Sequence, residues 1–501
     1  MSKETIRIHP ENSKIFEFRG KPLVLVCGTE HYGSVMNRPF RFERYLADAR
    51  DKSQTLTRLF TLFREMQSPV NPYSPCKPES PDYITPFLRV GPGRAQDSLP
   101  QYDLNQWNPE FFDRLHRFVS LASEYGIIVE VVPFSNTYDE TLWGLNPMYP
   151  KNNINGLSDI VFADYNSLRN EQLFEWQSRY TRKLVEELNP YENIFYEICN
   201  EPVSQILVDS KAPTRDEINA WQVAIADLIR QTESDLPNRH LVAGAEAWNM
   251  HEDINVFMQQ VEGVEVQPSD FAFGDYPVDI VNIHPLPNTT YKGGSYDLGA
   301  FMMKQLRLRP LRDYCLDSYH EVKPLNMDED NVATQFKDFD GWTIHRKRAW
   351  VTLLSGAHYD FIDFSIINYC ETGTEQSQRH IRSWMKYLSD YVHALDLVNA
   401  RPLTDLIKTE PAHTLEAVFG VAGKDYSIYL ADERELEDPG CGEEIQGELE
   451  INLPQGTYKL ACFSPRTGLY SPWSTREGSP KTIIQLPAFE HDIVVRIVTA
   501  E

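Results

Sequence analysis

The chain has 501 residues and a formal net charge of -25 at pH 7. Hydrophobic residues make up 41% of it, which is enough apolar material for one large domain and a smaller one. The strongly negative charge opposes binding to phosphate backbones and anionic membranes, because the long-range field repels them. We therefore expect a soluble protein with no nucleic-acid partner and no membrane partner. The sequence makes no prediction of the oligomeric state.

The cysteines and the N-terminus exclude several other classes. Seven cysteines are scattered without the spacing of a zinc site or of a small disulfide-rich domain, so we predict no metal site. The chain begins without an apolar stretch of signal-peptide length, and no run of about 18 apolar residues occurs in it. The sequence as it stands predicts a cytoplasmic protein, or a periplasmic or secreted one if the natural chain has been trimmed.

Amphipathic helices alternate with short apolar strands along the first 400 residues. Asn108 and Pro109 predict the start of a helix that Gly126 ends just before a strand. Thr214 and Glu217 form a capping box at the start of a later helix. The eight strands predicted in this way cover residues 23–27, 57–62, 127–132, 194–199, 241–245, 279–283, 325–327 and 361–366.

Short strands that are apolar on both faces and alternate with helices indicate a parallel sheet covered by helices, either open and doubly wound or closed. Gly28-Thr29-Glu30-His31 follows the first strand in place of a glycine-rich phosphate loop, which disfavours nucleotide binding. Eight units over about 400 residues fit an α/β fold of the (β/α)8 TIM-barrel type with long loop insertions. We predict this barrel over residues 1–400.

From residue 401 the residue pattern of the sequence changes. Segments such as Ser427-Ile428-Tyr429-Leu430 are short, rich in β-branched and aromatic residues, and separated by Gly, Pro, Asn or Asp. They predict a small antiparallel β-sandwich domain over residues 401–501. We interpret it as a cover on the flank of the barrel rather than as an independent carbohydrate-binding module.

In a barrel, catalytic groups lie where strands end and loops begin, on the C-terminal face. A lone carboxylate there is commonly a helix cap or an ion-pair partner, so position has to be combined with pattern. The carboxylates at or near the predicted strand ends are Glu30, Glu201, Glu246, Asp328, Glu329, Asp330, Asp360 and Asp363.

The most informative pattern is Asn200-Glu201-Pro202, directly after the predicted fourth strand. Here the sequence resembles the clan A glycoside hydrolases, barrel enzymes whose fourth strand ends in Asn-Glu and whose seventh strand ends in a second Glu. The resemblance implies that Glu201 is the general acid/base and that Asn200 binds the sugar 2-hydroxyl group. It extends to cellulase-like barrels followed by a small sandwich with a Pro-Arg-Thr-Gly turn, here at 465–468.

The second carboxylate is expected three βα units after the first. The segment 323–330 lies there, and its Glu329 is 128 residues after Glu201. The resemblance places the nucleophile on Glu329. Asp328 and Asp330 are its neighbours, and regular strand geometry predicts that Asp328 and Glu329 cannot both point into the cleft, because a strand alternates its faces.

Two carboxyl groups satisfy the chemistry of retaining hydrolysis when they lie about 5 to 5.5 Å apart. One attacks the anomeric carbon, and the other protonates the leaving oxygen and later activates water. We therefore predict a retaining glycosidase that cleaves an O-glycosidic bond in an oligo- or polysaccharide by double displacement. This chemistry demands no metal and no organic cofactor.

The remaining site predictions concern substrate binding. His284 closes the predicted sixth strand, where clan A enzymes place a His and a nearby Tyr; Leu286 stands where that Tyr is usual, so Tyr291 is the candidate. Arg58 matches a strand-two Arg that orients the nucleophile, and a buried structural ion pair is equally expected. Loop tryptophans on the active face could stack on a sugar. The other predicted substrate-binding residues are His31, Trp143, Trp248, Trp342 and Glu246.

Two alternatives from other classes stay open at this point. A non-catalytic carbohydrate-binding barrel would keep the cleft but turn over no glycan. A barrel metallohydrolase would bind a metal through Glu30, His31 and His284, although these residues lack the close spacing typical of a metal site.

Overall fold

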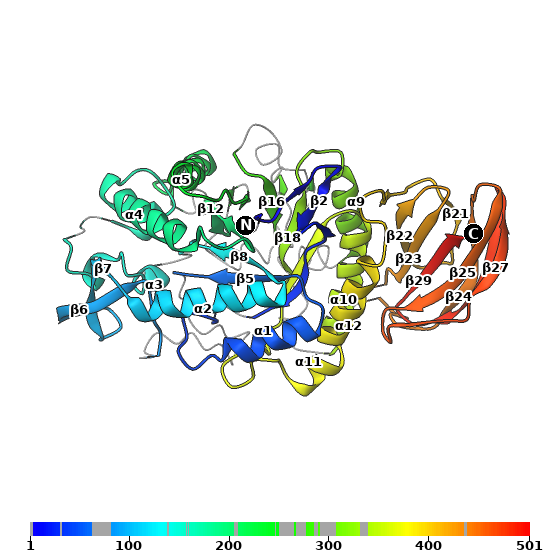
Figure 1. Cartoon of the computed structure of the whole chain (residues 1–501), viewed down its shortest axis with the longest axis horizontal. Helices are drawn as coiled ribbons and strands as arrows, with labels where there is room; N and C mark the ends of the chain where they lie inside the picture. The colour runs from blue at the N-terminus through cyan, green and yellow to red at the C-terminus, as the bar shows by residue number, and fades with distance from the viewer. Residues whose placement is uncertain are drawn as a thin grey trace.

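Figure 1 shows a barrel of strands and helices joined to a purely β-stranded part, which the chain reaches last (orange and red). The structure is a computed structural model. It describes residues 4–30, 33–62, 82–137, 140–156, 158, 160–204, 209–245, 247–249, 265–266, 277–284, 289–290, 307–330, 339–434 and 438–500.

Eight parallel strands form one sheet whose spatial order follows the chain order, so the predicted barrel fold is confirmed. The first and second strands, at the two ends of this order, come together where the Thr55 backbone N–H donates to the Val26 carbonyl oxygen at 3.1 Å. The strands are β4 (Val26–Thr29), β5 (Leu56–Phe60), β8 (Ile128–Val132), β10 (Ile194–Glu197), β13 (Val242–Gly244), β16 (Ile280–Ile283), β18 (Leu325–Asp330) and β19 (His358–Ile362).

Helices cover the outside of the barrel, and their ends follow the predicted capping chemistry. The Asn108 side chain accepts the backbone N–H of Glu110, and Gly126 ends that helix in the left-handed conformation with a φ of 75°. Thr214 and Glu217 form the predicted capping box. The described helices are α1 (Phe42–Asp51), α2 (Pro109–Tyr125), α3 (Glu140–Trp143), α4 (Glu171–Leu188), α5 (Arg215–Ser234), α9 (Leu308–Ser318), α10 (Phe339–Leu354), α11 (Glu375–Arg379) and α12 (Ile381–Val392).

A small antiparallel sheet closes the N-terminal end of the barrel. Phe16 and Phe18 belong to one hydrophobic cluster with the first residues of several barrel strands, such as Leu56 and Ile128. The prediction of one strand over 23–27 is wrong here, because it merged the last strand of this sheet with the first barrel strand. The strands of the small sheet are β1 (Arg7–His9), β2 (Asn12–Phe18) and β3 (Lys21–Leu23).

The described elements after residue 400 are antiparallel strands that pack as two sheets around an apolar core, as predicted for a sandwich. The boundary at residue 400 stays a prediction. An antiparallel hairpin between β5 and α2 was not predicted; its strands are β6 (Phe87–Arg94) and β7 (Pro100–Trp107). The strands of the sandwich are β20 (Arg401–Pro402), β21 (Ile407–Thr409), β22 (Thr414–Val421), β23 (Asp425–Asp432), β24 (Ile445–Ile451), β25 (Gly456–Ser464), β26 (Leu469–Tyr470), β27 (Ser474–Gly478), β28 (Thr482–Phe489) and β29 (Asp492–Thr499).

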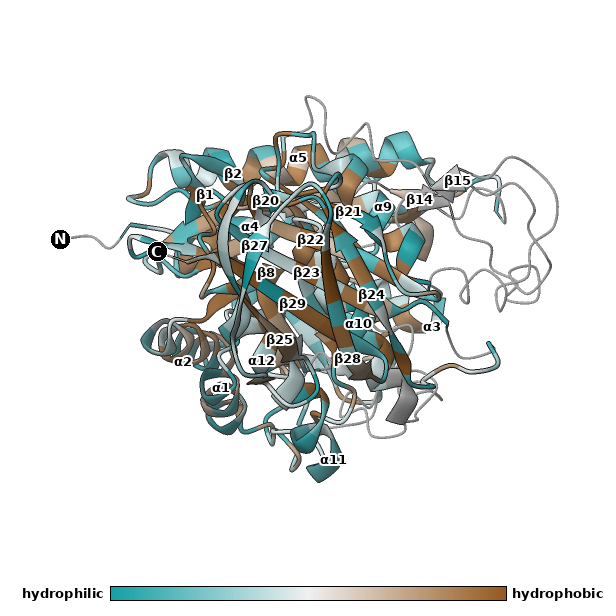
Figure 2. Cartoon of the chain, turned by 90° about the vertical axis from the view of Figure 1, so that its right-hand side faces the viewer, coloured by the Kyte–Doolittle hydropathy of each residue, from teal (hydrophilic) through white to brown (hydrophobic). Residues whose placement is uncertain are grey.

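Helices α9, α10 and α12 lie between the barrel and the sandwich (Figure 1). Arg346 of α10 donates to both carboxylate oxygens of Asp492, at 2.8 and 2.9 Å. Trp350 stacks on Tyr429 of β23 with ring centroids 5.6 Å apart. Figure 2 shows hydrophilic residues along the outer helices α1 and α2 and hydrophobic residues in the strands. Within the described residues, no helix is both long and apolar enough to span a membrane.

Candidate active site

Arg58 of β5 is the central charge inside the barrel, where its side chain is fully buried. Its Nε and Nη2 atoms donate to the two carboxylate oxygens of Glu197 at 2.7 and 2.6 Å. Nη2 also donates to Asn200 Oδ1 at 2.9 Å, and Nη1 donates to Glu329. Asp328 Oδ2 lies 3.2 Å from Nη2. The guanidinium is thus shared among three carboxylates, and it fixes the position of Glu329.

Strand β18 contains an irregularity that turns two consecutive acids into the barrel. Its pairing with β19 shifts between Met327 and Asp330, so β18 carries one extra residue over this stretch. A bulge of this kind breaks the alternation of faces. Asp328 and Glu329 therefore both contact Arg58. The prediction that only one of them could face the cleft is wrong, because it assumed a regular strand.

Asp330 points away from the barrel interior. Arg348 Nε donates to its Oδ2 at 2.6 Å, and the Tyr359 hydroxyl donates to the same oxygen at 2.8 Å. Burial alone would raise the pKa of Asp330, but the charge of Arg348 lowers it well below its usual value. Asp330 thus joins the strand to helix α10, and its contacts leave it outside the cleft.

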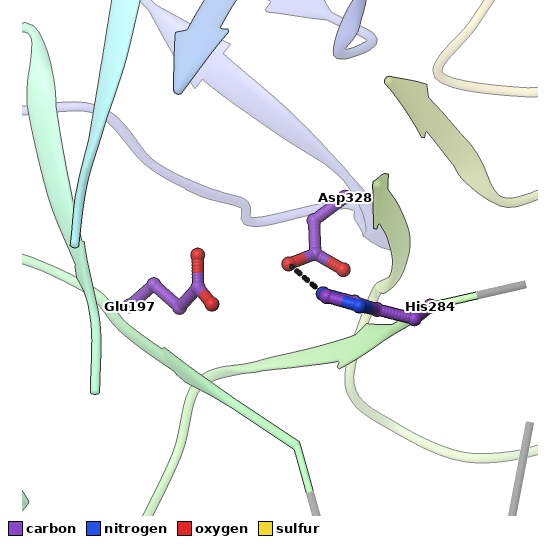
Figure 3. Close-up of side chains that lie close together, drawn as sticks. All are labelled: Glu197, His284 and Asp328. Carbon is purple, nitrogen blue, oxygen red and sulfur yellow. Dashed lines mark ion pairs between the residues drawn. The ribbon is translucent and has the colours of Figure 1, made fainter. Parts of the chain in front are cut away.

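His284, directly after β16, connects the acids of two other barrel segments. Its Nδ1 lies 3.1 Å from Glu201 Oε1, and its Nε2 lies 3.5 Å from Asp328 Oδ2 and 4.0 Å from Glu329 Oε2. Figure 3 shows Glu197, His284 and Asp328 directed toward one another, with the ion pair between the last two dashed. Burial alone would lower the pKa of His284, but the charges of Asp328 and Glu329 raise it well above its usual value.

Glu201 and Glu329 face each other across the mouth of the barrel. A carboxylate oxygen of each and a ring nitrogen of His284 all lie within 4.8 Å of one another. The Glu201 side chain is 27% exposed and that of Glu329 only 3%. An oxygen pair within 4.8 Å agrees with the roughly 5 to 5.5 Å between the carboxyl groups of retaining glycosidases, which is shorter than the roughly 6.5 to 9.5 Å of inverting ones. The cluster has the ligand spacing of a metal site, but the Arg58 guanidinium already supplies the countercharge there.

Further acids lie deeper in the barrel. Asn282 Nδ2 donates to Glu130 Oε1 at 2.7 Å and to Asp328 Oδ2 at 3.0 Å. Burial and the charge of Glu197 raise the pKa of Glu130 well above its usual value. Burial also raises the pKa of Glu197 to about 7, although the paired guanidinium lowers it, and burial raises the pKa of Asp360 well above its usual value. Glu130 and Asp360 therefore stay protonated beneath the cleft near neutral pH.

Two other strand-end acids have local roles. Glu30 accepts the backbone N–H groups of Gly33 and Ser34 at 2.5 and 3.0 Å. Asp363 accepts the backbone N–H of Ser365 at 3.0 Å and its hydroxyl at 2.6 Å. Both carboxylates thus hold the turn that follows their strand, as expected for a cap.

The tryptophans that were predicted to form sugar platforms do not lie in exposed loops where the structure describes their side chains. Trp143 is completely buried in α3, with its ring against Tyr149 and Tyr165, so its prediction as an exposed platform is wrong. Trp342 lies in helix α10 rather than in a loop, and its half-buried ring stacks on His380.

Four further predicted residues cannot be placed in this way. The backbone of Trp248 pairs with Val203, and its side chain is not among the described ones. His31, Glu246 and Tyr291 lie outside the described residues.

The sequence reasoning missed the acids of the barrel interior. Glu130 stands in Ile-Val-Glu-Val-Val and Glu197 in Ile-Phe-Tyr-Glu-Ile, two apolar strands that each contain one carboxylate. A charged residue within a strand that is buried on both faces needs a partner inside the barrel. That expectation, applied to Arg58 as well, would have indicated the network.

The Cellulase (glycosyl hydrolase family 5) family model matches residues 88–321, a little under half of the chain. A glycoside hydrolase family 5 structure from Bacteroides vulgatus is similar over 99% of this chain and 93% of its own, with 13% identity and a TM-score of 0.60. A structure named glycoside hydrolase is similar over 99% and 97%, with 12% identity and a TM-score of 0.56. No curated protein matches the chain.

The closed barrel and the two facing carboxyl groups at its C-terminal mouth define the class of barrel glycosidases. The chain has the barrel fold of these structures, and over residues 88–321 it is similar to the cellulase-like glycoside hydrolases of family 5.

Proposed function

We propose that Glu329 is the nucleophile and Glu201 the general acid/base in double displacement at an O-glycosidic bond of an oligo- or polysaccharide. The observation that carries the proposal is the proximity of the two carboxyl groups, which have an oxygen pair within 4.8 Å. Their surroundings differ in the sense that the two roles require: Glu329 is buried against a guanidinium, and Glu201 is partly exposed.

In the first step, Glu329 attacks the anomeric carbon while Glu201 gives its proton to the leaving oxygen. Arg58 holds the Glu329 carboxylate in place for this attack through the hydrogen bond that its Nη1 donates. The leaving group departs with the electron pair of the broken C–O bond. The sugar then remains as an ester of Glu329.

In the second step, Glu201 acts as a base. It takes a proton from water, and the water oxygen attacks the anomeric carbon from the side of the departed group while the bond from that carbon to the Glu329 oxygen breaks and returns its electron pair to the carboxylate. Two inversions restore the original configuration. Asn200, whose Nδ2 donates to Ser135 Oγ at 2.9 Å, lies beside Glu201 and is the proposed contact of the sugar 2-hydroxyl group.

The test is azide rescue of two matched variants on an aryl β-glycoside. Glu201→Ala should lower kcat/KM by about 10²- to 10⁴-fold with a poor leaving group, and with an activated leaving group azide should restore turnover and yield a glycosyl azide of retained configuration. Glu329→Ala should give a glycosyl azide of inverted configuration. NMR of the wild-type product gives the stereochemistry. Inverted wild-type product, or wild-type rates in both variants, would contradict the proposal, and absence of any turnover would favour a binding protein.

A further inference from the structure

Asp328 has no role in the double displacement, yet it is fully buried at the centre of the site. Its Oδ2 atom takes three contacts, from Arg58 Nη2 at 3.2 Å, His284 Nε2 at 3.5 Å and Asn282 Nδ2 at 3.0 Å. Its Oδ1 has no hydrogen-bond partner among the residues that the structure describes. A carboxylate held this way puts a negative charge on the face of His284 opposite Glu201.

The protonation of His284 depends on a competition at Nε2. Arg58 Nη2, 3.5 Å away, can donate to Nε2 only when Nε2 carries no proton. Asp328 accepts from Nε2 only when it does. The titratable or charged groups of the described residues near His284 are Arg58 of β5, Glu197 of β10, Glu201 after β11 (Cys199–Asn200), and Asp328 and Glu329 of β18.

The negative charges outweigh Arg58 in this competition. The charge of Asp328, followed by that of Glu329, overcomes the effect of burial and raises the pKa of His284 well above its usual value. With Nε2 protonated and turned to Asp328, the Nδ1–H group is free to donate to Glu201 Oε1 at 3.1 Å.

We propose that Asp328 is a positioning residue that keeps His284 a cation, so that the imidazolium stabilises the carboxylate form of the acid/base Glu201. The inference rests on the proposed role of Glu201 and deepens it. When Glu201 gives its proton to the leaving oxygen, the new negative charge forms beside a positive one. His284 keeps its own proton through both steps.

The variant Asp328→Asn tests the proposal because it removes the charge and keeps the shape. His284 then loses its counter-ion and becomes neutral at working pH, so Glu201 holds its proton to higher pH. The basic limb of the pH profile of kcat/KM should move up by about one pH unit. With less acidic Glu201, kcat/KM should fall about three- to tenfold for a poor leaving group and change little for a dinitrophenyl glycoside.

Asp330→Asn is the matched control, since Asp330 is equally buried two residues along and points to the other side. It should lower the melting temperature and leave both limbs in place. The proposal would be overturned if the basic limb of the Asp328→Asn profile stayed in place or moved to lower pH. A direct effect of the lost negative charge on Glu201 would lower the pKa of Glu201, which is the opposite of the expected shift.

A double-mutant cycle separates the route through His284 from any other route. In the background of His284→Gln, the change Asp328→Asn should produce no further shift of the basic limb. A full shift in that background would overturn the proposal. Azide rescue of Glu201→Ala distinguishes the proposed role of Glu201 from that of Asp328. If azide fails to restore turnover, the role of Glu201 is wrong. If azide restores turnover but Asp328→Asn leaves the basic limb of the pH profile unchanged, the role of Asp328 is wrong.

Discussion

The barrel and the sandwich handle buried charge in different ways. The buried carboxylates of the sandwich, Asp432 and Asp492, each pair with one arginine: Arg434 for the first and Arg346 of helix α10 for the second. The core between its sheets consists of hydrophobic side chains. In the barrel, Arg58 is shared by three carboxylates, and acids stand where a barrel of this size usually holds apolar layers.

The two ways of burying charge have different consequences for stability and for catalysis. A buried ion pair is often no better for stability than an apolar pair of the same size, because both ions lose their hydration. Sharing Arg58 among three carboxyl groups is worse still, since none of them has a cation of its own. The arrangement nevertheless sets the protonation of His284, Glu197 and Glu130, which an apolar core cannot do. The barrel interior is therefore built for the reaction and the sandwich core for folding.

Replacing the shared arginine should give the largest effect. Arg58→Lys keeps the charge, but one ammonium group cannot bind Glu197 and Glu329 with the geometry of the guanidinium. We expect kcat/KM to fall by about 100-fold or more, because the nucleophile loses its fixed position. The free energy of unfolding should drop by about 3 kcal/mol in urea denaturation.

Arg348→Lys is the control, because Arg348 is equally buried and binds Asp330 on the outer side of β18. It should cost stability and leave kcat/KM per folded molecule near the wild-type value. Equal losses of kcat/KM in Arg58→Lys and Arg348→Lys would show that a buried arginine inside the barrel matters no more for activity than one on the outer side of β18.

A cavity in the sandwich should show the reverse behaviour. Leu449 of β24 is fully buried in the apolar core. Leu449→Ala should lower the free energy of unfolding by about 3 kcal/mol, the usual cost of a buried Leu-to-Ala change. Steady-state kinetics at 25 °C should give an unchanged kcat/KM. A large fall in kcat/KM at a temperature where the variant is folded would mean that the sandwich takes part in the reaction.

Glu130→Gln should give the smallest effect, and it depends on pH. The folded state raises the pKa of Glu130 above its ordinary value of 4.5, so its contribution to stability is full below that value and is lost as pH rises through the folded pKa. Gln has no such dependence. As pH rises from 5 toward the folded pKa, the variant should gain stability relative to wild type at up to about 1.4 kcal/mol per pH unit, as measured by urea unfolding at each pH. Parallel curves for the two proteins would mean that Glu130 does not retain its proton.

The sequence by itself determined the features that depend on neighbours in the chain. The caps at Asn108 and Thr214 predicted helix ends, because capping bonds join residues two or three positions apart. Asn200 and Glu201 stood out for the same reason, as a short motif at a strand end. The pattern of eight apolar strands predicted the barrel, since only a helix-covered parallel sheet buries both faces of every strand.

Only the tertiary structure decided how distant strands combine. The bulge in β18 depends on its pairing with β19, and no pattern within 325–330 predicts it. Trp143 is buried because Tyr149 and Tyr165 pack around it, which its loop-like sequence does not indicate. The sharing of Arg58 joins residues up to 271 positions apart. Such contacts depend on which side chains the closed barrel brings together, and the local sequence does not indicate which distant residues these are.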